Sequence, residues 1–313
     1  PVGGRGSRRA TFGERFADKV GQLGSYGGGN HFGECEVVRL AAGDRARAAA
    51  GTFGLRDGQV AFLSHCGSRG LGHDLATMQL RTLEALFAER GTPLPAGDRQ
   101  LVHAELGSPE ANDYLDDMAL AANFATVNHL LINTLVLEAF DEVIPGAAGD
   151  LVSLISHNIV RPEPVDGRRG GPVEWVHRKG ATRALPPGHP ELAGTPFATV
   201  GHPILLPGNP QAGSVVMVAE PGAELTAFSV NHGAGRRMGR RAAARRLDQR
   251  RVDASFAAAD ILTNARRYPI DEAPEAYKDF GEVLRSVERA GLARPVARLE
   301  ARFVIKDGGP ADD

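Results

Sequence analysis

Four of the ten histidines stand in polar, mostly glycine-flanked surroundings that are typical of turns and strand ends. They are His31, His65, His157 and His232. Glycine lets the backbone approach a ligand closely, and imidazole is a good ligand for borderline divalent metals. Histidines delivered by separate strand ends predict a metal site. Each of them taken alone fits equally well a partly buried, hydrogen-bonded side chain.

His232 differs from the others because it immediately precedes the turn Gly233-Ala234-Gly235 and an arginine-rich segment. A helix that begins just after this turn would present free backbone N–H groups, which bind phosphate oxygens. A neutral imidazole beside a bound phosphate can attack phosphorus without a strong base. A turn before a solvated basic helix is the alternative interpretation.

Two segments carry enough positive charge to contact a polyanion. Residues 176–183 are predicted to form a loop with Arg178, Lys179 and Arg183, which suits an RNA backbone or a triphosphate, or else surface salt bridges. Between His232 and Arg251, Asp248 is the one acidic residue among eight arginines at 236, 237, 240, 241, 245, 246, 250 and 251.

The remaining histidines are interpreted as ordinary structural residues; these are His73, His103, His129, His177, His189 and His202. Cys66, next to His65, is either a soft ligand or a small core residue, and the second interpretation is favoured.

The composition is that of a globular protein, with 42% hydrophobic and 24% charged residues in 313. The net charge of -2 gives no sign of nucleic-acid binding by itself. Cys35 and Cys66 cannot build a disulfide framework, so we expect a reducing compartment, the cytoplasm. No run approaches the roughly 18 apolar residues of a membrane span, and residues 1–9 do not read as a signal peptide, so we expect no membrane partner.

Hydrophobic periodicity and the positions of glycine and proline predict an α+β fold. Helices are predicted at 74–90, 109–140, 236–247 and 280–290. Strands are predicted at 35–40, 60–64, 151–160, 173–176, 203–206, 214–219 and 227–230.

Taken together, several short blocks of this chain resemble the RtcB family of RNA-splicing ligases. The matching blocks are Gly-Gly-Gly-Asn-His-Phe at 27–32, His-Cys-Gly-Ser-Arg-Gly-Leu-Gly at 65–72, Ser-His-Asn at 156–158, His-Arg-Lys-Gly-Ala-Thr-Arg at 177–183, His-Gly-Ala-Gly-Arg at 232–236, Ala-Tyr-Lys-Asp at 276–279 and Val-Ile-Lys at 304–306. They occur in family order over nearly the whole chain, which argues strongly against chance agreement.

The resemblance implies an RtcB-like fold in one catalytic domain over residues 1–313, with a mixed β-sheet core around the active site and flanking helices. It implies two Mn2+ ions and GTP as cofactors. By analogy His31, His65 and His157 bind metal, and His232 takes GMP as a phosphoramidate. Contacts to GMP are expected from Asn30, His31, Phe32, Gly33, Glu34, His157, Asn158, Pro207, Gly208, Asn209, Pro210, Ser214, His232, Gly233, Ala234, Gly235 and Lys306. RNA phosphates are expected at Arg69, Lys179 and Arg240.

The implied reaction joins an RNA 3′-phosphate or 2′,3′-cyclic phosphate end to a 5′-hydroxyl end, in tRNA splicing or RNA repair, and some family members need archease as a helper. Two features depart from the family pattern. Nothing in residues 1–29 matches the Asp-x-x-Cys-Gly block that supplies further metal ligands, so we expect the chain to continue upstream of Pro1. Pro210 also removes a backbone donor from the nucleotide loop.

Two other functions remain open from the sequence. The same metals could activate water, which would make the protein a metal-dependent phosphodiesterase acting on RNA termini without GTP. An RNA-binding relative that has lost its metal site is the non-catalytic alternative.

Overall fold

The computed structural model describes residues 17–164, 166, 170–264 and 267–307. The first sixteen residues, on which the expectations about a signal peptide and part of the missing metal block fall, lie outside the described residues. The described chain divides into two compact units, a smaller one of residues 17–31 and 64–149 and a larger one of residues 32–63 and 150–307.

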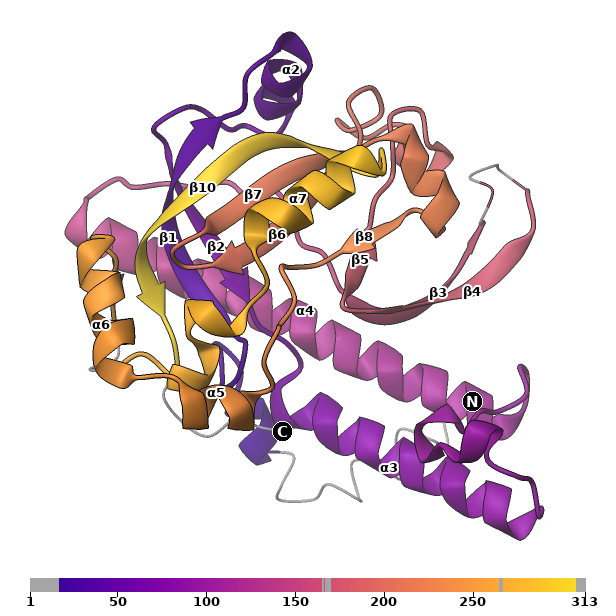
Figure 1. Cartoon of the computed structure of the whole chain (residues 1–313). Helices are drawn as coiled ribbons and strands as arrows, with labels where there is room; N and C mark the ends of the chain where they lie inside the picture. The colour runs from indigo at the N-terminus through magenta and orange to yellow at the C-terminus, as the bar shows by residue number, and fades with distance from the viewer. Residues whose placement is uncertain (1–16, 165, 167–169, 265–266, 308–313) are drawn as a thin grey trace. The chain divides into compact units, whose positions relative to one another are not determined.

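The larger unit is built on a six-stranded sheet in the order β2-β1-β10-β7-β6, with β9 also on β10 (Figure 1). Its strands are β1 (Phe32–Leu40), β2 (Val60–His65), β6 (Pro203–Asn209), β7 (Gly213–Ala219), β9 (Leu262–Thr263) and β10 (Ala293–Ile305). β10 pairs antiparallel with β1 and β7 and parallel with β9. The expected α+β fold with a mixed sheet is confirmed.

The sheet is buried on both faces, as the alternation of side chains in β7 shows. Val215, Met217 and Ala219 belong to one apolar cluster, and Val216 and Val218 belong to another. Successive side chains of a strand point to opposite faces, so a run of apolar residues makes a strand covered on both sides.

Each face of the sheet is covered by one helix. α7 (Phe280–Arg289) packs Phe280 and Val287 onto the face of Met217. α2 (Asp44–Thr52) packs Ala49 and Ala50 onto the face of Val218. The core of the larger unit is therefore a helix–sheet–helix sandwich.

Two short ladders extend the larger unit. β3 (Asn158–Pro164) pairs with β4 (Val173–Lys179), and β5 (Ala181–Arg183) pairs with β8 (Ser229–Asn231). The remaining helices are α5 (Arg240–Arg246) and α6 (Gln249–Ala258), with the 3-10 turns η3 (Pro190–Leu192), η4 (Pro221–Thr226), η5 (Ile270–Glu272) and η6 (Pro274–Ala276).

The smaller unit is a pair of long helices, α3 (Arg69–Glu89) and α4 (Pro109–Val143), joined through η1 (Pro95–Gly97) and η2 (Arg99–Leu101). Ser108 caps α4 by accepting a hydrogen bond from the Ala111 amide at 3.2 Å. Among the described helices α4 alone is long and apolar enough to cross a membrane, on length and composition only.

The buried side chain of Asn128 in α4 holds the glycine-rich segment that precedes β1. Its Oδ1 accepts from the Gly24 amide at 2.7 Å, and its Nδ2 donates to the carbonyls of Ser25 and Gly67, each at 3.1 Å. One side chain thereby fixes both the approach to His31 and the turn after His65.

Several predicted elements need correction. The strand expected at 151–160 begins only at Asn158, and the helix expected from residue 236 begins at Arg240. The expected loop at 176–183 is instead the end of β4, Gly180 and β5. The helices α2 and α6, the two-residue strand β9 and the central strand β10 were not predicted. β10 was missed because its arginines and Pro295 interrupt the apolar alternation.

Gly213 begins β7 with φ +70°, and a Cβ built there would lie 2.2 Å from the carbonyl oxygen of Leu299 on β10. Gly58 has a similar φ of +76° with nothing within 4 Å of its Cβ position. We expect Gly58→Ala to cost about 1 kcal/mol of unfolding free energy and Gly213→Ala on the order of 3 kcal/mol, because only the second adds a clash to the strain. Denaturant unfolding measures both, and equal costs would contradict a close β7–β10 contact at Gly213.

Candidate metal and nucleotide site

The four singled-out histidines all lie at the ends of strands. His31 immediately precedes β1, His65 is the last residue of β2, His157 immediately precedes β3, and His232 follows β8. Strand ends combine a rigid backbone with access for a ligand. The expected placement of these residues is confirmed.

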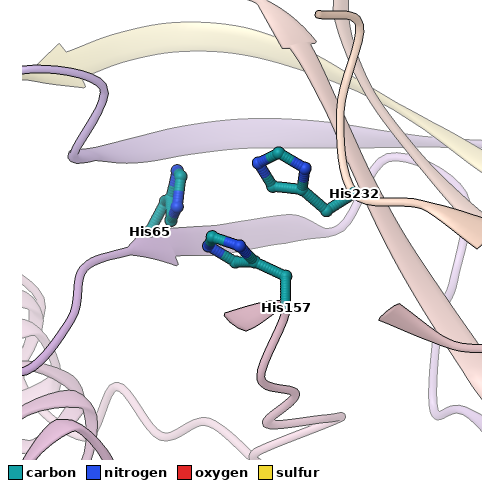
Figure 2. Close-up of side chains that lie close together, drawn as sticks. All are labelled: His65, His157 and His232. Atoms are coloured by element: carbon teal, nitrogen blue, oxygen red, sulfur yellow. The ribbon is translucent and has the colours of Figure 1, made fainter. Parts of the chain in front are cut away.

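Three of these histidines converge. His65, His157 and His232 each offer one ring nitrogen, and these atoms all lie within 4.8 Å of one another (Figure 2). His65 is carried by β2, which is a strand of the six-stranded sheet. Three imidazoles are a donor set that suits divalent first-row metals, so the residues present fit a metal ion.

Ring contacts define the arrangement further. The rings of His157 and His232 stack, with centroids 4.1 Å apart and planes 23° apart. His31 is not one of the three converging residues, although its ring meets that of His65 edge to face at 5.5 Å.

The turn at Gly180, between β4 and β5, positions both stacked histidines. Its carbonyl accepts from the His232 amide at 3.2 Å, and its amide donates to Oδ1 of Asn158 at 2.9 Å. Gly180 has φ +67°, and a Cβ there would lie 3.4 Å from the His232 ring. The positive φ favours glycine here, and the imidazole lies in van der Waals range of the backbone at this position.

The segment after His232 is held by neighbouring loops rather than by a helix. The Ala234 amide donates to the Pro207 carbonyl at 3.2 Å, and the Gly235 carbonyl accepts from the Lys278 amide at 2.9 Å. α5 begins five residues after Gly235, so the expected helix N-terminus at this turn is wrong. The turn of Gly233 to Gly235 lies instead directly against Pro207, another residue assigned to the nucleotide.

The hairpin between β6 and β7 closes through a side chain. Oδ1 of Asn209 accepts from the amides of Gln211 and Ala212 at 3.1 and 3.0 Å. Pro210, which follows Asn209, is buried. The hairpin therefore forms without the amide that Pro210 lacks. Ser214 follows on β7 and is buried, with its hydroxyl without a hydrogen-bond partner among the described residues.

A buried carboxylate, Glu272 in η5, gathers the positive charges around the end of β10. It accepts hydrogen bonds from Nη1 of Arg236 at 2.7 Å, from Nε of Arg240 at 3.3 Å and from the hydroxyl of Tyr277. The ammonium of Lys306 lies 3.7 Å from its Oε2. Burial lowers the pKa of Lys306, and the charge of Glu272 acts in the opposite direction.

Two further carboxylates, Glu34 and Glu36, are buried side by side on β1. Burial raises the pKa of Glu34 to about 7, and hydrogen bonding from Glu36 and the charge of Lys306 lower it in part. Burial and the charge of Glu34 raise the pKa of Glu36 well above its ordinary range.

The residues expected to hold RNA have different surroundings. Lys179 is exposed at the end of β4. Nε of Arg69 donates to the hydroxyl of Ser25, and its Nη1 donates to the Tyr26 carbonyl. The guanidinium lies where a Cβ of residue 27 would be, which Gly27 leaves open. Arg240 is half-buried in the Glu272 group. The binding of RNA by these three residues stays a prediction.

Two side chains prominent in the sequence have structural roles. Arg178 is buried and forms a two-pronged salt bridge with Glu163, at 2.9 and 2.6 Å. Burial raises the pKa of the Cys66 thiol to about 12, as expected for a small core residue. Arg178 is therefore not available to a polyanion.

Comparison with known proteins identifies the family. Residues 7–307 match the family model described as tRNA-splicing ligase RtcB. The chain belongs to the RtcB family. It is 40% identical over 293 residues to the tRNA-splicing ligase RtcB of Aeropyrum pernix, with 91% of this chain and 59% of that protein covered. It is also 40% identical to the RNA-splicing ligase RtcB of Mycobacterium tuberculosis, with 92% and 65% covered. The chain thus spans about three fifths of the length of these relatives.

Within this RtcB chain the structure brings together residues that are far apart in sequence. The metal and nucleotide candidates His157, Asn158 and His232 meet at Gly180, and the Pro207 loop meets the turn after His232. Glu36 and Glu272 were missed by sequence reasoning. For Glu36 a signal was present, since it lies two residues from Glu34 on the same face of a strand.

If the three converging imidazoles bind metal, His157→Ala should lower the affinity for Mn2+ by about tenfold or more, because one ligand is lost. His177→Ala is the matched control, since His177 is exposed on β4 and outside the cluster. Calorimetric titration with Mn2+ measures both variants. Equal affinities would contradict the metal site.

Glu272→Gln removes the one negative charge shared by Arg236, Arg240 and Lys306. We expect a loss of stability on the order of 3 kcal/mol, because the buried ammonium of Lys306 and the two partly buried guanidinium groups then lose their common counter-charge. Glu275→Gln, exposed in η6, is the control and should change stability by less than about 0.5 kcal/mol. Denaturant unfolding distinguishes them, and a stable Glu272→Gln protein would show that the group does not depend on this charge.

Proposed function

We propose that this protein is a GTP- and Mn2+-dependent RNA ligase that joins 3′-phosphate or 2′,3′-cyclic phosphate ends to 5′-hydroxyl ends. The observation that carries the proposal is the convergence of His232 with His65 and His157, in a chain of the RtcB family. The relatives are named as tRNA-splicing and RNA-splicing ligases.

His65 and His157 supply neutral nitrogen donors for a divalent ion, with His31 against His65 as a further candidate. A bound Mn2+ would neutralise negative charge that develops on a phosphate during transfer. Ligands beyond these histidines are proposed to come from the Asp-x-x-Cys-Gly block of the family.

His232 is the proposed nucleophile. A ring nitrogen of its neutral imidazole attacks the α-phosphorus of GTP, a P–N bond forms, the bond to the β-phosphate oxygen breaks, and pyrophosphate leaves. Stacking on His157 restricts the ring of His232, and the hydrogen bond from its backbone amide to Gly180 holds its backbone. Restricting the attacking group in this way lowers the entropic part of the barrier.

The GMP group then passes from His232 to the RNA 3′-phosphate, after any cyclic phosphate has been opened by water. Attack by the 5′-hydroxyl on the activated 3′-phosphate forms the new phosphodiester bond and releases GMP. The neutral imidazole of His232 is regenerated at the transfer step, so each turnover consumes one GTP.

The nucleotide is proposed to lie against the turn of Gly233 to Gly235, the Pro207 loop and the residues around the end of β10. Lys306 and Glu34 offer one positive and one negative group there, and Ser214 offers a hydroxyl. A neighbourhood with both charges and a hydroxyl suits a nucleobase, which presents both donors and acceptors.

RNA is proposed to follow the exposed cations. Lys179 lies one residue from Gly180, and the exposed arginines of α5 and α6 are Arg241, Arg245, Arg246, Arg250 and Arg251. Exposed Lys and Arg bind phosphates without reading sequence, which suits an enzyme that acts on RNA ends. A cytoplasmic location and help from archease, which some family members need, complete the proposal.

Incubation with Mn2+ and α-labelled GTP should label the protein through an acid-labile bond, and His232→Ala should abolish the label. His177→Ala should be labelled like the wild type, because His177 is exposed on β4 and outside the cluster. Gel autoradiography with and without acid treatment measures the label.

Label that survives in His232→Ala would contradict the proposal. Opening of a cyclic phosphate without GTP, together with no label in the wild type, would instead identify a metal-dependent phosphodiesterase.

A further inference from the structure

Glu36 is a buried acid whose surroundings are unusual. Its side chain is 0% exposed, and within the described residues no N–H or O–H group donates a hydrogen bond to either carboxylate oxygen. A buried ionised carboxylate without donors costs far more free energy than a buried carboxylic acid. The environment therefore favours a proton on Glu36.

The carboxylate that acts on Glu36 is that of Glu34, which is 3% exposed. Alternation along β1 places the two side chains on the same face of the strand, two residues apart. Two carboxylates in such a position cannot both ionise, and two acceptors can form a hydrogen bond only if one carries a proton. The pair therefore has one proton to hold between its members.

The charged groups around the pair decide which member holds the proton. The positive charge of Lys306, after β10, acts on Glu34. Glu36 is influenced by Glu34 and by the hydroxyl of Ser214 on β7. Charge on Glu34 is thus compensated, whereas charge on Glu36 is not.

The other titratable groups near the pair do not alter this distribution. Tyr268 and Cys35 feel the negative charge of Glu34 and Glu36 respectively, and burial raises the pKa of each, so both stay neutral. Beyond Lys306, the charges of Glu272, Asp271 and Arg240 act on the lysine.

We propose that Glu36 is a positioning residue that keeps a proton and donates it as a hydrogen bond to Glu34, so that Glu34 faces the nucleotide as a fixed, ionised carboxylate. The inference rests on the proposed function, in which Glu34 contacts GMP. An ionised carboxylate has two acceptor oxygens and no donor, and it matches a base that presents adjacent N–H donors, as guanine does.

The proposal predicts a pH dependence with a definite sign. Because the pKa of Glu34 is raised to about 7, GMP binding should weaken as the pH falls through that value and Glu34 takes up its own proton. Loss of the donor at Glu36 should raise the pKa of Glu34 further, and the midpoint should move to higher pH.

The test compares Glu36→Gln, whose amide still donates, with Glu36→Leu, which fills the space without a donor. Val38→Ala, next on the same face of β1 and also 0% exposed, is the control for lost packing. Calorimetric titration with GMP across the pH range measures affinity. Infrared spectroscopy of the nucleotide-free protein at about pH 9, two units above the pKa of about 7 of Glu34, detects a protonated carboxyl at Glu36 without a contribution from Glu34.

Glu36→Gln and Val38→Ala should bind GMP within about twofold of the wild type, and Glu36→Leu about tenfold more weakly near neutral pH, with its midpoint roughly one unit higher. The infrared carboxylic-acid band of the wild type should disappear in Glu36→Gln. Equal binding and equal midpoints in Glu36→Leu and the wild type would overturn the proposal, as would a band that persists in Glu36→Gln.

The two measurements distinguish a failure of this inference from a failure of the proposed function. A wild-type protein that binds no GMP contradicts the proposed function, whereas the infrared band of the nucleotide-free protein still decides whether Glu36 carries the proton.

Discussion

The antiparallel pairing of β10 with β1 and β7 is the interaction on which the candidate nucleotide site depends. The register places Glu34 opposite Val304 and Ser214 opposite Leu299, so residues from three distant segments lie at one end of the sheet. Lys306 directly follows β10. A slip of one residue in this register would turn every side chain of β10 to the other face and separate these groups. The bulge between Cys35 and Glu36 shows that the pairing is adjusted locally at this end.

Burying charge at this end of the sheet requires compensation, and the structure provides it in two ways. Glu272 is matched by several positive groups, Arg236, Arg240 and Lys306. Glu34 and Glu36 have fewer positive groups around them. Their negative charge is compensated by Lys306 and by the proton that the two carboxylates share. The first arrangement is an ordinary buried ion network, stable across a wide pH range because arginine stays charged. The second can change its protonation near neutral pH, which is why it bears on nucleotide binding.

Much of this arrangement was predictable from sequence where the signal is local. The positions of the four histidines at strand ends, the two long helices, and the α+β class follow from glycine placement and hydrophobic period. The helices were predicted at 74–90 and 109–140 and lie at 69–89 and 109–143. β10 was not predictable in this way, because its exposed and half-buried arginines break the period although it is the most paired strand. The helix after His232 was misplaced because the residues from Arg236 to Met238 bond to η6 and η5 instead of continuing a helix. Such contacts depend on residues some 35 positions away, and no local pattern records them.

The two halves of the candidate site are positioned by different physical means, and this difference decides how each responds to substitution. The stacked histidines His157 and His232 are fixed by backbone, through the hydrogen bonds and the positive φ of Gly180. The nucleotide groups Glu34 and Lys306 are fixed by burial and mutual charge, so their geometry and their protonation are coupled. A change in pH near neutrality therefore acts on nucleotide binding through the protonation of Glu34, whereas a substitution at Gly180 acts on the orientation of the proposed nucleophile.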